Sequence, residues 1–397
     1  MSGRMRSSGS GRIVRLIVAC AVVGGLTAGC GSADPGGPGT EAPSPAATRT
    51  ANTGGCLIGA SWYNMTEVMD WEEPAFQKAL QDAGANFQET DAKSSPDTQR
   101  SDIDRLIAAG SKVIVIEPGP EDVILPALQR ATSAGIPVVT LFQSPLKHAR
   151  SLYVAFDPVE QGRQEARGLL AVKPKGDYAI IKGDSRAPES NLIASGIREI
   201  LQPAVDRGDI KIVAEVETPN WDSTLAQQEM TAILSQNGGS IDAVAVEDDS
   251  TAYWVEQTLQ EARLTGRVAV AGVSDRQGAV SGLTAIGIGT QAVDAWGNPE
   301  RPGEAAAHAA MALCHDPDIT RVEGSASVTW PGRDPMTAIL LAPLAITKDN
   351  IGVVINTSTQ WRQSVCPTGP SIFAPLPACQ LGPVPVASAS PSSQPST

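Results

Sequence analysis

Apolar segments of strand length alternate with amphipathic segments of helix length over most of the chain, and this alternation constrains the fold more than any other feature. The pattern starts near Cys56 with LIGAS and a helical stretch at 72–83, whose apolar residues recur on one side. It continues through KVIVIEP, IPVVTLF, DYAIIKG, IKIVAEV, IDAVAVE and RVAVAGV, most of them followed by a helical segment. Such alternation predicts βαβ units and parallel sheets that helices cover on both faces.

The number of predicted strands, roughly ten, is high for one open sheet and favours an α/β fold with two doubly wound lobes. A length of 397 residues and a hydrophobic content of 42% are sufficient for two cores. The chain is expected to pass between lobes at LYVAFDPVEQG, where a strand runs into Asp157 and Pro158. In open α/β sheets ligands bind beyond the carboxyl ends of the strands. We therefore expect the strand ends of two facing lobes to line a ligand cleft.

The N-terminus has the features of an export signal. Arg4, Arg6 and Arg12 precede a mostly apolar run at 13–23, which is too short for a permanent membrane span, and LTAGC follows at 26–30. Small residues before a cysteine resemble a bacterial lipobox. This predicts a signal peptide over 1–29, a lipid on Cys30 and a flexible tether over 30–55. The alternative is an ordinary secretory peptide cleaved after an alanine. The lipobox interpretation places the body outside the cell, anchored to the outer face of the bacterial membrane.

Four cysteines remain once Cys20 and Cys30 are set aside, and three pairings of them are possible. Cys366 and Cys379 bracket a proline-rich stretch that has little else to hold it, so we favour a disulfide between them. Cys56 with Cys314 is the next choice. For this second pair, free buried thiols are the alternative.

Charge and motifs exclude several classes of function. A net charge of −13 without a basic face argues against nucleic-acid binding. The three histidines have no nucleophile partner and no known zinc spacing, and no P-loop is present. GIGTQA, at 287–292, imitates a dinucleotide fingerprint but comes late in the chain, and we interpret it as a crossover between lobes. We therefore expect no enzyme, no cofactor and no metal.

Several segments occur together in the order and spacing of one family. The chain resembles, over about 58–355, the xylose-binding-protein-like members of the sugar-binding (ribose/galactose-type) solute receptors of ABC importers. The segments that carry the resemblance are SDIDRLIAAGSKVIVIEP, VAFDPVEQG, IDAVAVEDDST, GRVAVAGVSD, GTQAVDAW and ILLAPLAITKDNI.

The resemblance implies a periplasmic binding protein fold of type 1, in which two lobes joined by three crossovers close on one sugar. The crossovers would lie near Asp157, at 290–291 and at 342–343. Lobe one would then comprise 56–156 and 292–341, and lobe two 157–291 and 342–355. A C-terminal extension, 356–397, would follow, with a tail rich in proline and serine that is expected to be disordered.

The family's ligand contacts carry over unevenly. Asp249 matches the acidic residue of an Asn-Asp pair, Asp248 stands at the asparagine, and Trp221 matches a pocket tryptophan. Glu67 and Gln143 stand where the family has arginine. Ser274 and Gly297 replace an aspartate and a lysine, and paired asparagines are replaced at 187–189. The candidate ligand contacts are Asp249, Asp248, Trp221, Asn64, Glu67, Gln143, Glu189, Asp275 and Trp62.

These residue types suit a sugar, because an aromatic ring covers an apolar ring face and carboxylates hold hydroxyl groups. These candidate contacts also have structural interpretations. Asp248 or Asp249 would instead cap the helix that starts near Thr251, and Trp221 would be a residue of the lobe surface. Trp254 and Trp296 would be lids or packing residues. Trp71, Trp330 and Trp361 are predicted to be structural.

Losing basic residues while gaining Glu67 and Glu189 makes the expected cleft acidic, which favours a ligand with an amino group, such as an amino sugar. The predicted function is a solute-binding lipoprotein that delivers a monosaccharide, or a related amino sugar, to an ABC permease and its ATPase. The alternatives are a receptor that reports to a sensor kinase and, less favoured, a surface enzyme on the same fold.

Overall fold

The computed structural model describes residues 48–49, 55–142, 150–274, 279–331, 333–356, 359–366 and 379. For Thr48, Arg49, Glu67, Ala279 and Thr359 it describes only the backbone. All of these residues belong to one contact unit, Ala46–Thr397. The predicted signal peptide, Cys30, most of the tether and the C-terminal tail lie outside the described residues.

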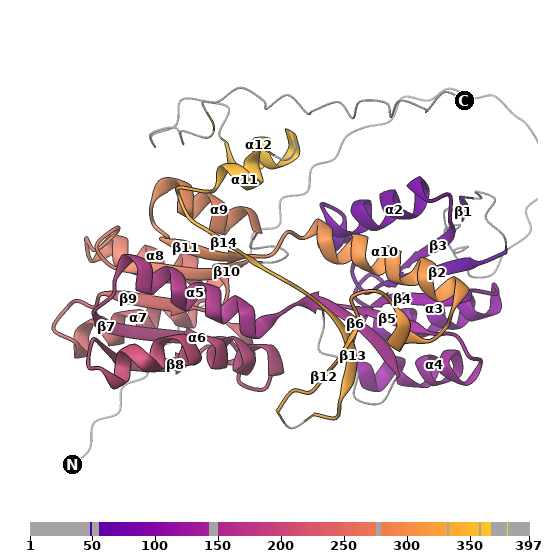
Figure 1. Cartoon of the computed structure of the whole chain (residues 1–397), viewed down its shortest axis with the longest axis horizontal. Coiled ribbons are helices and arrows are strands. Elements are labelled where there is room, and N and C mark those ends of the chain that lie inside the picture. The colour runs from indigo at the N-terminus through magenta and orange to yellow at the C-terminus, as the bar shows by residue number, and fades with distance from the viewer. Residues whose placement is uncertain are drawn as a thin grey trace, which may run out of the picture. The chain divides into compact units, whose positions relative to one another are not determined.

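The first sheet is parallel in its centre and antiparallel at both edges (Figure 1). Its edge strands β1 and β12 run antiparallel to β3 and β13, respectively. In spatial order its strands are β1 (Thr48–Arg49), β3 (Asn86–Asp91), β2 (Leu57–Trp62), β4 (Val113–Glu117), β5 (Val138–Leu141), β6 (Ser151–Phe156), β13 (Met336–Leu341) and β12 (Ala326–Val328).

Strand β4 shows why this sheet carries helices on both faces. Its residues are apolar without a break, and successive side chains point to opposite faces of a sheet. Val113 and Val115 pack with α2 (Glu72–Asp82) and α10 (Glu300–His315), whereas Ile114 and Ile116 pack with α3 (Pro96–Ala108) and α4 (Glu121–Ser133). The two helix pairs flank the sheet in Figure 1. A short helix, α1 (Met65–Val68), follows β2, and a 3-10 turn, η2 (Ile319–Arg321), follows α10.

The second sheet is parallel apart from β14, which pairs antiparallel with β11. In spatial order its strands are β14 (Leu344–Ile346), β11 (Val293–Trp296), β10 (Ala269–Ser274), β9 (Ala243–Val246), β7 (Gly176–Lys182) and β8 (Ile210–Glu217). The two central strands β9 and β10 are completely buried.

Helices cover both faces of the second sheet as well. Along β7, Tyr178 and Ile180 pack with α5 (Pro158–Val172) and α6 (Pro188–Asp206), whereas Ala179 and Ile181 pack with α7 (Leu225–Gln236) and α8 (Asp249–Glu261). The remaining elements of this lobe are η1 (Pro219–Trp221), α9 (Ala279–Ile288), α11 (Gly352–Ile355) and α12 (Thr359–Val365). The predicted fold class, two α/β lobes with mostly parallel sheets, is confirmed.

The first and third crossovers leave the first sheet after β6 and after β13. Strands β6 and β13 pair up to Phe156 and Leu341, so the two crossovers leave the first sheet side by side, and the amide of Asp157 donates to the carbonyl of Leu341 (2.9 Å). Arg301 at the start of α10 donates to the carbonyl of Ala342 (3.2 Å). This bond ties the second crossover to the third.

The second crossover lies later than expected. Strand β11 pairs with β10, so residues 292–296 belong to lobe two rather than lobe one, and the chain crosses at 297–299. The expected crossover at 290–291 is therefore wrong. A strand of only four residues carries no local signal for the sheet that it joins, because both sheets offer parallel neighbours.

Two disulfides are present, Cys56–Cys314 and Cys366–Cys379, with Cα–Cα distances of 5.9 and 5.7 Å. These are the pairings favoured from the sequence. The first joins the residue before β2 to the end of α10, so it closes lobe one across most of the chain. Among the described residues, no helix has the length and apolar character needed to cross a membrane.

Candidate ligand-binding site

Backbone strain among the described residues gathers at the carboxyl ends of the strands. Lys93 and Ser94 follow β3, Phe142 follows β5, and Asn220 and Trp221 follow β8; all have φ between 51° and 59°. Residues other than glycine rarely adopt this left-handed conformation, and where they do, the strain often accompanies a functional site. The same edge is where open α/β sheets hold ligands.

Trp221 is the exposed aromatic residue at this edge. Its side chain is 39% exposed, and its ring lies against Gly183 at the end of β7. A Cβ atom added at Gly183 would lie 2.1 Å from the indole carbon Cζ3. The absence of a side chain at Gly183 therefore leaves room for the indole at the strand end, while Trp221 as a whole remains partly exposed.

The loops after β7 and β8 are joined by a charged group next to Trp221. Arg186 donates from Nε to Asp184 (2.9 Å) and from Nη2 to the side chain of Asn220 (2.6 Å), and the amide of Asn220 donates to Asp184 (2.7 Å). Hydrogen bonds from the Arg186 side chain, above all, hold the pKa of Asp184 well below its usual range. Asp184 is therefore ionised, and its charge is balanced by that of Arg186. Its hydrogen bond from Asn220 fixes the loop that carries Trp221.

The three acidic residues after β9 lie in three different environments. Glu247 is buried and accepts hydrogen bonds from the amide of Gly183 (2.9 Å) and the hydroxyl of Ser190. Burial raises the pKa of Glu247 to about 8. Asp248 is half-buried and caps α8 by accepting from the amide of Thr251 (2.9 Å).

Asp249 lies inside lobe two. It is 3% exposed, and its Oδ1 accepts a hydrogen bond from Gln291 (2.9 Å). Its carboxylate is enclosed by the backbone of Gly272 on β10 and Gly282 on α9, where an added Cβ atom would approach it to 2.1 and 2.0 Å. Burial, followed by the charge of Asp294, raises the pKa of Asp249 well above its usual range. The structure therefore differs from the expectation that Asp249 contacts the ligand, because its carboxylate is enclosed by the lobe.

Trp62 also differs from expectation. It is 1% exposed, packs edge-on against Phe76 and donates from Nε1 to Glu89 (2.9 Å), so it is a core residue of lobe one. The next residue, Tyr63, lies at the strand end instead, with its ring against Gly119 and its hydroxyl donating to the carbonyl of Ser94 (3.0 Å). In a strand, neighbouring residues point to opposite faces. A predicted contact position that is wrong by one residue therefore names a core residue, Trp62, in place of its neighbour at the strand end, Tyr63.

The remaining candidates are placed as follows. Asn64 is half-buried and caps α1 by accepting from the amide of Thr66. Glu189 is half-buried in the first turn of α6. Gln143 and Asp275 lie outside the described residues, as does the side chain of Glu67.

Sequence reasoning missed Tyr63, Arg186 and Gln99. Gln99 is buried and bridges the ends of β2 and β4, donating to the carbonyls of Ser61 (3.3 Å) and Glu117 (2.7 Å) and accepting from the amide of Gly119 (2.7 Å). The partners of Gln99 are about twenty residues away or more, so no local pattern marks it. In the described part of the chain, no group of three or more His, Cys, Asp or Glu side chains could hold a metal ion.

Comparison with known proteins identifies the family that shares this architecture. A family model described as a periplasmic binding protein domain matches residues 58–316. The D-xylose-binding periplasmic protein of Escherichia coli is 28% identical over 278 residues, 70% of this chain and 82% of that protein. The xylitol-binding protein of Mycolicibacterium smegmatis is 27% identical over 349 residues, 87% of this chain and 89% of that protein.

Solved structures agree on the fold. The carbohydrate transporter solute-binding protein of Chloroflexus aurantiacus, in complex with D-glucose, has a TM-score of 0.61 at 20% identity, covering 76% of this chain and 94% of that one. At this identity the likeness concerns the fold alone. Because the family model spans well over half of the sequence, the chain belongs to the periplasmic binding protein domain family.

Proposed function

We propose that this protein is an extracytoplasmic binding protein that captures a monosaccharide or a related polyol and delivers it to an ABC permease. The observation that carries the proposal is Trp221, an exposed indole held over Gly183 at the carboxyl edge of the second sheet. An accessible aromatic face is the group that covers the apolar face of a sugar ring. The relatives named for D-xylose and xylitol support the same ligand class.

The charges at this edge favour a neutral ligand over an amino sugar. The carboxylate of Asp184 is neutralised by Arg186. Burial raises the pKa of both Glu247 and Asp249, which favours their uncharged forms. The edge therefore carries less negative charge than its number of carboxyl groups indicates. We retain Asp248 and Glu189 as candidate contacts for hydroxyl groups.

Calorimetric titration of the purified chain with D-xylose, xylitol and glucosamine tests this proposal. We expect binding of a neutral ligand, and loss of at least about tenfold in affinity in Trp221→Ala, since truncation of a well-placed aromatic contact costs about 1.4 kcal/mol or more. Tyr253→Ala is the matched control, because Tyr253 is an exposed aromatic residue (51%) that packs on Trp254 of α8. Tighter binding of glucosamine would instead restore the amino-sugar hypothesis.

Gly183→Ala tests whether Gly183 positions the indole of Trp221, without removing the ring. The new methyl group would displace the indole, so we expect binding to weaken as it does in Trp221→Ala. The double variant should bind no more weakly than Trp221→Ala alone, because the ring that the methyl group displaces is already absent. Independent, additive losses in the double variant would contradict this role for Gly183.

Delivery to a permease, and the lipid on Cys30, are parts of the same proposal. Uptake of the bound sugar by cells lacking this protein should fall, and Cys30→Ala should release the protein from the membrane fraction. A ligand response that needs a sensor kinase but no uptake would support the receptor alternative. Conversion of the ligand by the purified protein would support the enzyme alternative.

A further inference from the structure

The start of the C-terminal extension packs on lobe two and contacts lobe one. Residues of α11 and α12 form one apolar cluster with α9, β11 and β14, all of lobe two. Trp71 is packed against the same cluster. It is the N-cap residue of α2, and α2 packs against α10 in the core of lobe one.

Trp361 of α12 is the centre of this contact. It is fully buried, and its ring stacks on Trp71 with centroids 3.9 Å apart and an interplanar angle of 14°. On another side it meets Trp296 edge-on, at 5.3 Å and 78°. The neighbouring Gln360 donates to the carbonyl of Asp70 (3.0 Å). One helix of the extension therefore contacts residues of both lobes.

The position of this stack along the chain connects it with the hinge. Trp296 is the last residue of β11, directly before the second crossover at 297–299. Beyond the crossover, Gly303 of α10 lies so close to Glu72 that an added Cβ atom would be 2.2 Å from its carbonyl oxygen. Trp71 therefore stands beside the segment through which the chain leaves lobe two.

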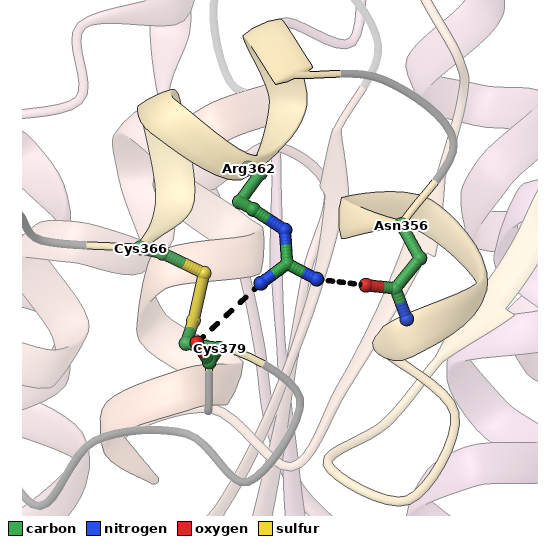
Figure 2. Close-up of a disulfide and its surroundings, with 4 residues drawn as sticks. All are labelled: Asn356, Arg362, Cys366 and Cys379. Carbon is green, nitrogen blue, oxygen red and sulfur yellow. Dashed lines mark hydrogen bonds between the residues drawn. A yellow bond between two sulfur atoms is a disulfide. The ribbon is translucent and has the colours of Figure 1, made fainter. Parts of the chain in front are cut away.

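The disulfide Cys366–Cys379 and Arg362 hold α12 in place (Figure 2). Cys366 follows α12 directly. Arg362 points between two segments, donating from Nη1 to the carbonyl of Cys379 (3.4 Å) and from Nη2 to the side chain of Asn356 after α11. The helix is thus held at its middle through Arg362, which binds Asn356 and Cys379, and directly after its end through the disulfide.

We propose that α12 is an interlobe latch: Trp361, held by the Cys366–Cys379 disulfide, joins Trp71 of lobe one to Trp296 of lobe two and restrains rotation about the hinge. The stack, with centroids 3.9 Å apart, is short-ranged, since a gap of about an ångström already removes roughly a quarter to a half of the dispersion attraction. Any rotation that moves the start of α2 away from β11 must break it. The latch therefore biases the populations of lobe arrangements, and through them the affinity for ligand.

The distance between lobes, measured without ligand, tests the latch independently of the proposed function. Spin labels on non-natural residues at Lys78 of α2 and Lys211 of β8 would report it by pulsed electron paramagnetic resonance, because both side chains are exposed. We expect Trp361→Ala and Trp71→Ala each to broaden or shift the distance distribution. The double variant should resemble either single variant, because both remove one stack.

Two controls separate the latch from a loss of folding. Trp361→Phe keeps an aromatic ring and should retain the distribution of the parent protein. Leu80→Val weakens the core of lobe one through the same helix as Trp71 without touching the stack, and it should leave the distribution unchanged. If Trp361→Ala and Trp71→Ala also leave it unchanged, or if Leu80→Val alters it equally, the latch is excluded.

The disulfide is tested in the same assay with Cys366→Ser/Cys379→Ser, which spares Cys56–Cys314. We expect this variant to behave like Trp361→Ala. A distribution identical to that of the parent protein would overturn the role of the disulfide. Titration of the same variants with D-xylose or xylitol should then give affinities that change at least about threefold, in one direction, for every variant that alters the distribution.

Discussion

Glu247, Asp248 and Asp249 follow one another in the sequence, yet each has a different partner. Glu247 meets a backbone amide and a serine hydroxyl, Asp248 caps a helix, and Asp249 meets Gln291 inside the lobe. Burial without a basic partner favours the uncharged form of a carboxyl group. Glu165, buried on α5 and bonded to the amide of Val246, is affected in the same direction, with burial the main cause of its raised pKa and the charge of Glu247 a further one.

This environment gives lobe two a predictable dependence on pH. Glu247 has a pKa of about 8 in the fold against 4.5 for the unperturbed group, so unfolding releases a proton between these values. Its contribution to stability is therefore complete below about 4.5 and is lost as pH rises through about 8, at no more than about 1.4 kcal/mol per pH unit. Glu247→Gln, which stays neutral, should flatten the fall in unfolding free energy measured in urea across this range.

Glu261→Gln is the control for this measurement, because Glu261 lies exposed at the end of α8. It should keep the slope of the parent protein. An equal slope in the parent and in Glu247→Gln would show that Glu247 is charged in the fold.

At the scale of elements, helix α8 begins with a residue, Asp248, that both caps the helix and lies at the carboxyl end of a strand, where the ligand is proposed to bind. Its N-cap Asp248 accepts from the amide of Thr251, one of the unpaired donors that begin every helix. The same residue stands directly beyond β9, where the proposed ligand would lie. Stability and binding can therefore be separated by substitution.

We expect Asp248→Ala to lower the unfolding free energy by about 1 kcal/mol, whereas Asp248→Ser, which can still cap, should retain most of it. Both variants should weaken binding, because both remove the carboxylate. Urea unfolding and calorimetric titration measure the two effects. Full affinity in Asp248→Ser would restrict Asp248 to capping.

The disulfide Cys56–Cys314 closes a loop of 258 residues, against 13 for Cys366–Cys379. In the chain-entropy model a longer loop gives greater stabilisation, and loss of a native disulfide costs roughly 2–5 kcal/mol. We expect Cys56→Ser/Cys314→Ser to lower the melting temperature of the protein more than Cys366→Ser/Cys379→Ser does, as measured by calorimetry. A larger fall in melting temperature for Cys366→Ser/Cys379→Ser would show that the disulfide after α12 stabilises the protein more.

At the scale of the whole molecule, three crossovers lie together and α12 adds a fourth connection between the lobes. Asp157, Arg301 and Ala342 link the crossovers by hydrogen bonds to or from the backbone. Such a hinge lets ligand contacts shift the balance between lobe arrangements only to the extent that they favour one of them.

Ligand binding should therefore stabilise the whole molecule in proportion to affinity. At a ligand concentration one hundred times Kd, we expect about 2.7 kcal/mol of added stability, seen as a rise in melting temperature. Tryptophan emission should also change on binding, because Trp221 is partly exposed at the proposed site. At the same ligand concentration, a tenfold loss of affinity in Trp221→Ala should reduce the added stability to about 1.4 kcal/mol, and removal of the indole should abolish most of the emission change. Unchanged responses in that variant would place the ligand elsewhere.

Particular residues show how much of the structure could be predicted from the sequence. The helix expected from Thr251 begins at Asp249, so the sequence pattern located the helix and misplaced its start. Trp221, predicted to be a pocket residue, lies beyond the end of β8, and its contact with a ligand stays a prediction. Trp62 is in the core, because its burial depends on Phe76 and Glu89. Trp361 was expected to be structural, but nothing in its sequence neighbourhood indicated Trp71 as its partner.

The amino-acid sequence by itself determined the two-lobed α/β architecture, because hydrophobic period and turn residues act between near neighbours in the chain. The tertiary structure alone decided which carboxyl groups are charged, which tryptophans are accessible, and which sheet β11 joins. Those properties depend on partners distant in sequence, such as Gln291 for Asp249, Gly183 for Trp221 and Trp71 for Trp361. Burial and pairing arise only when folding brings such residues together.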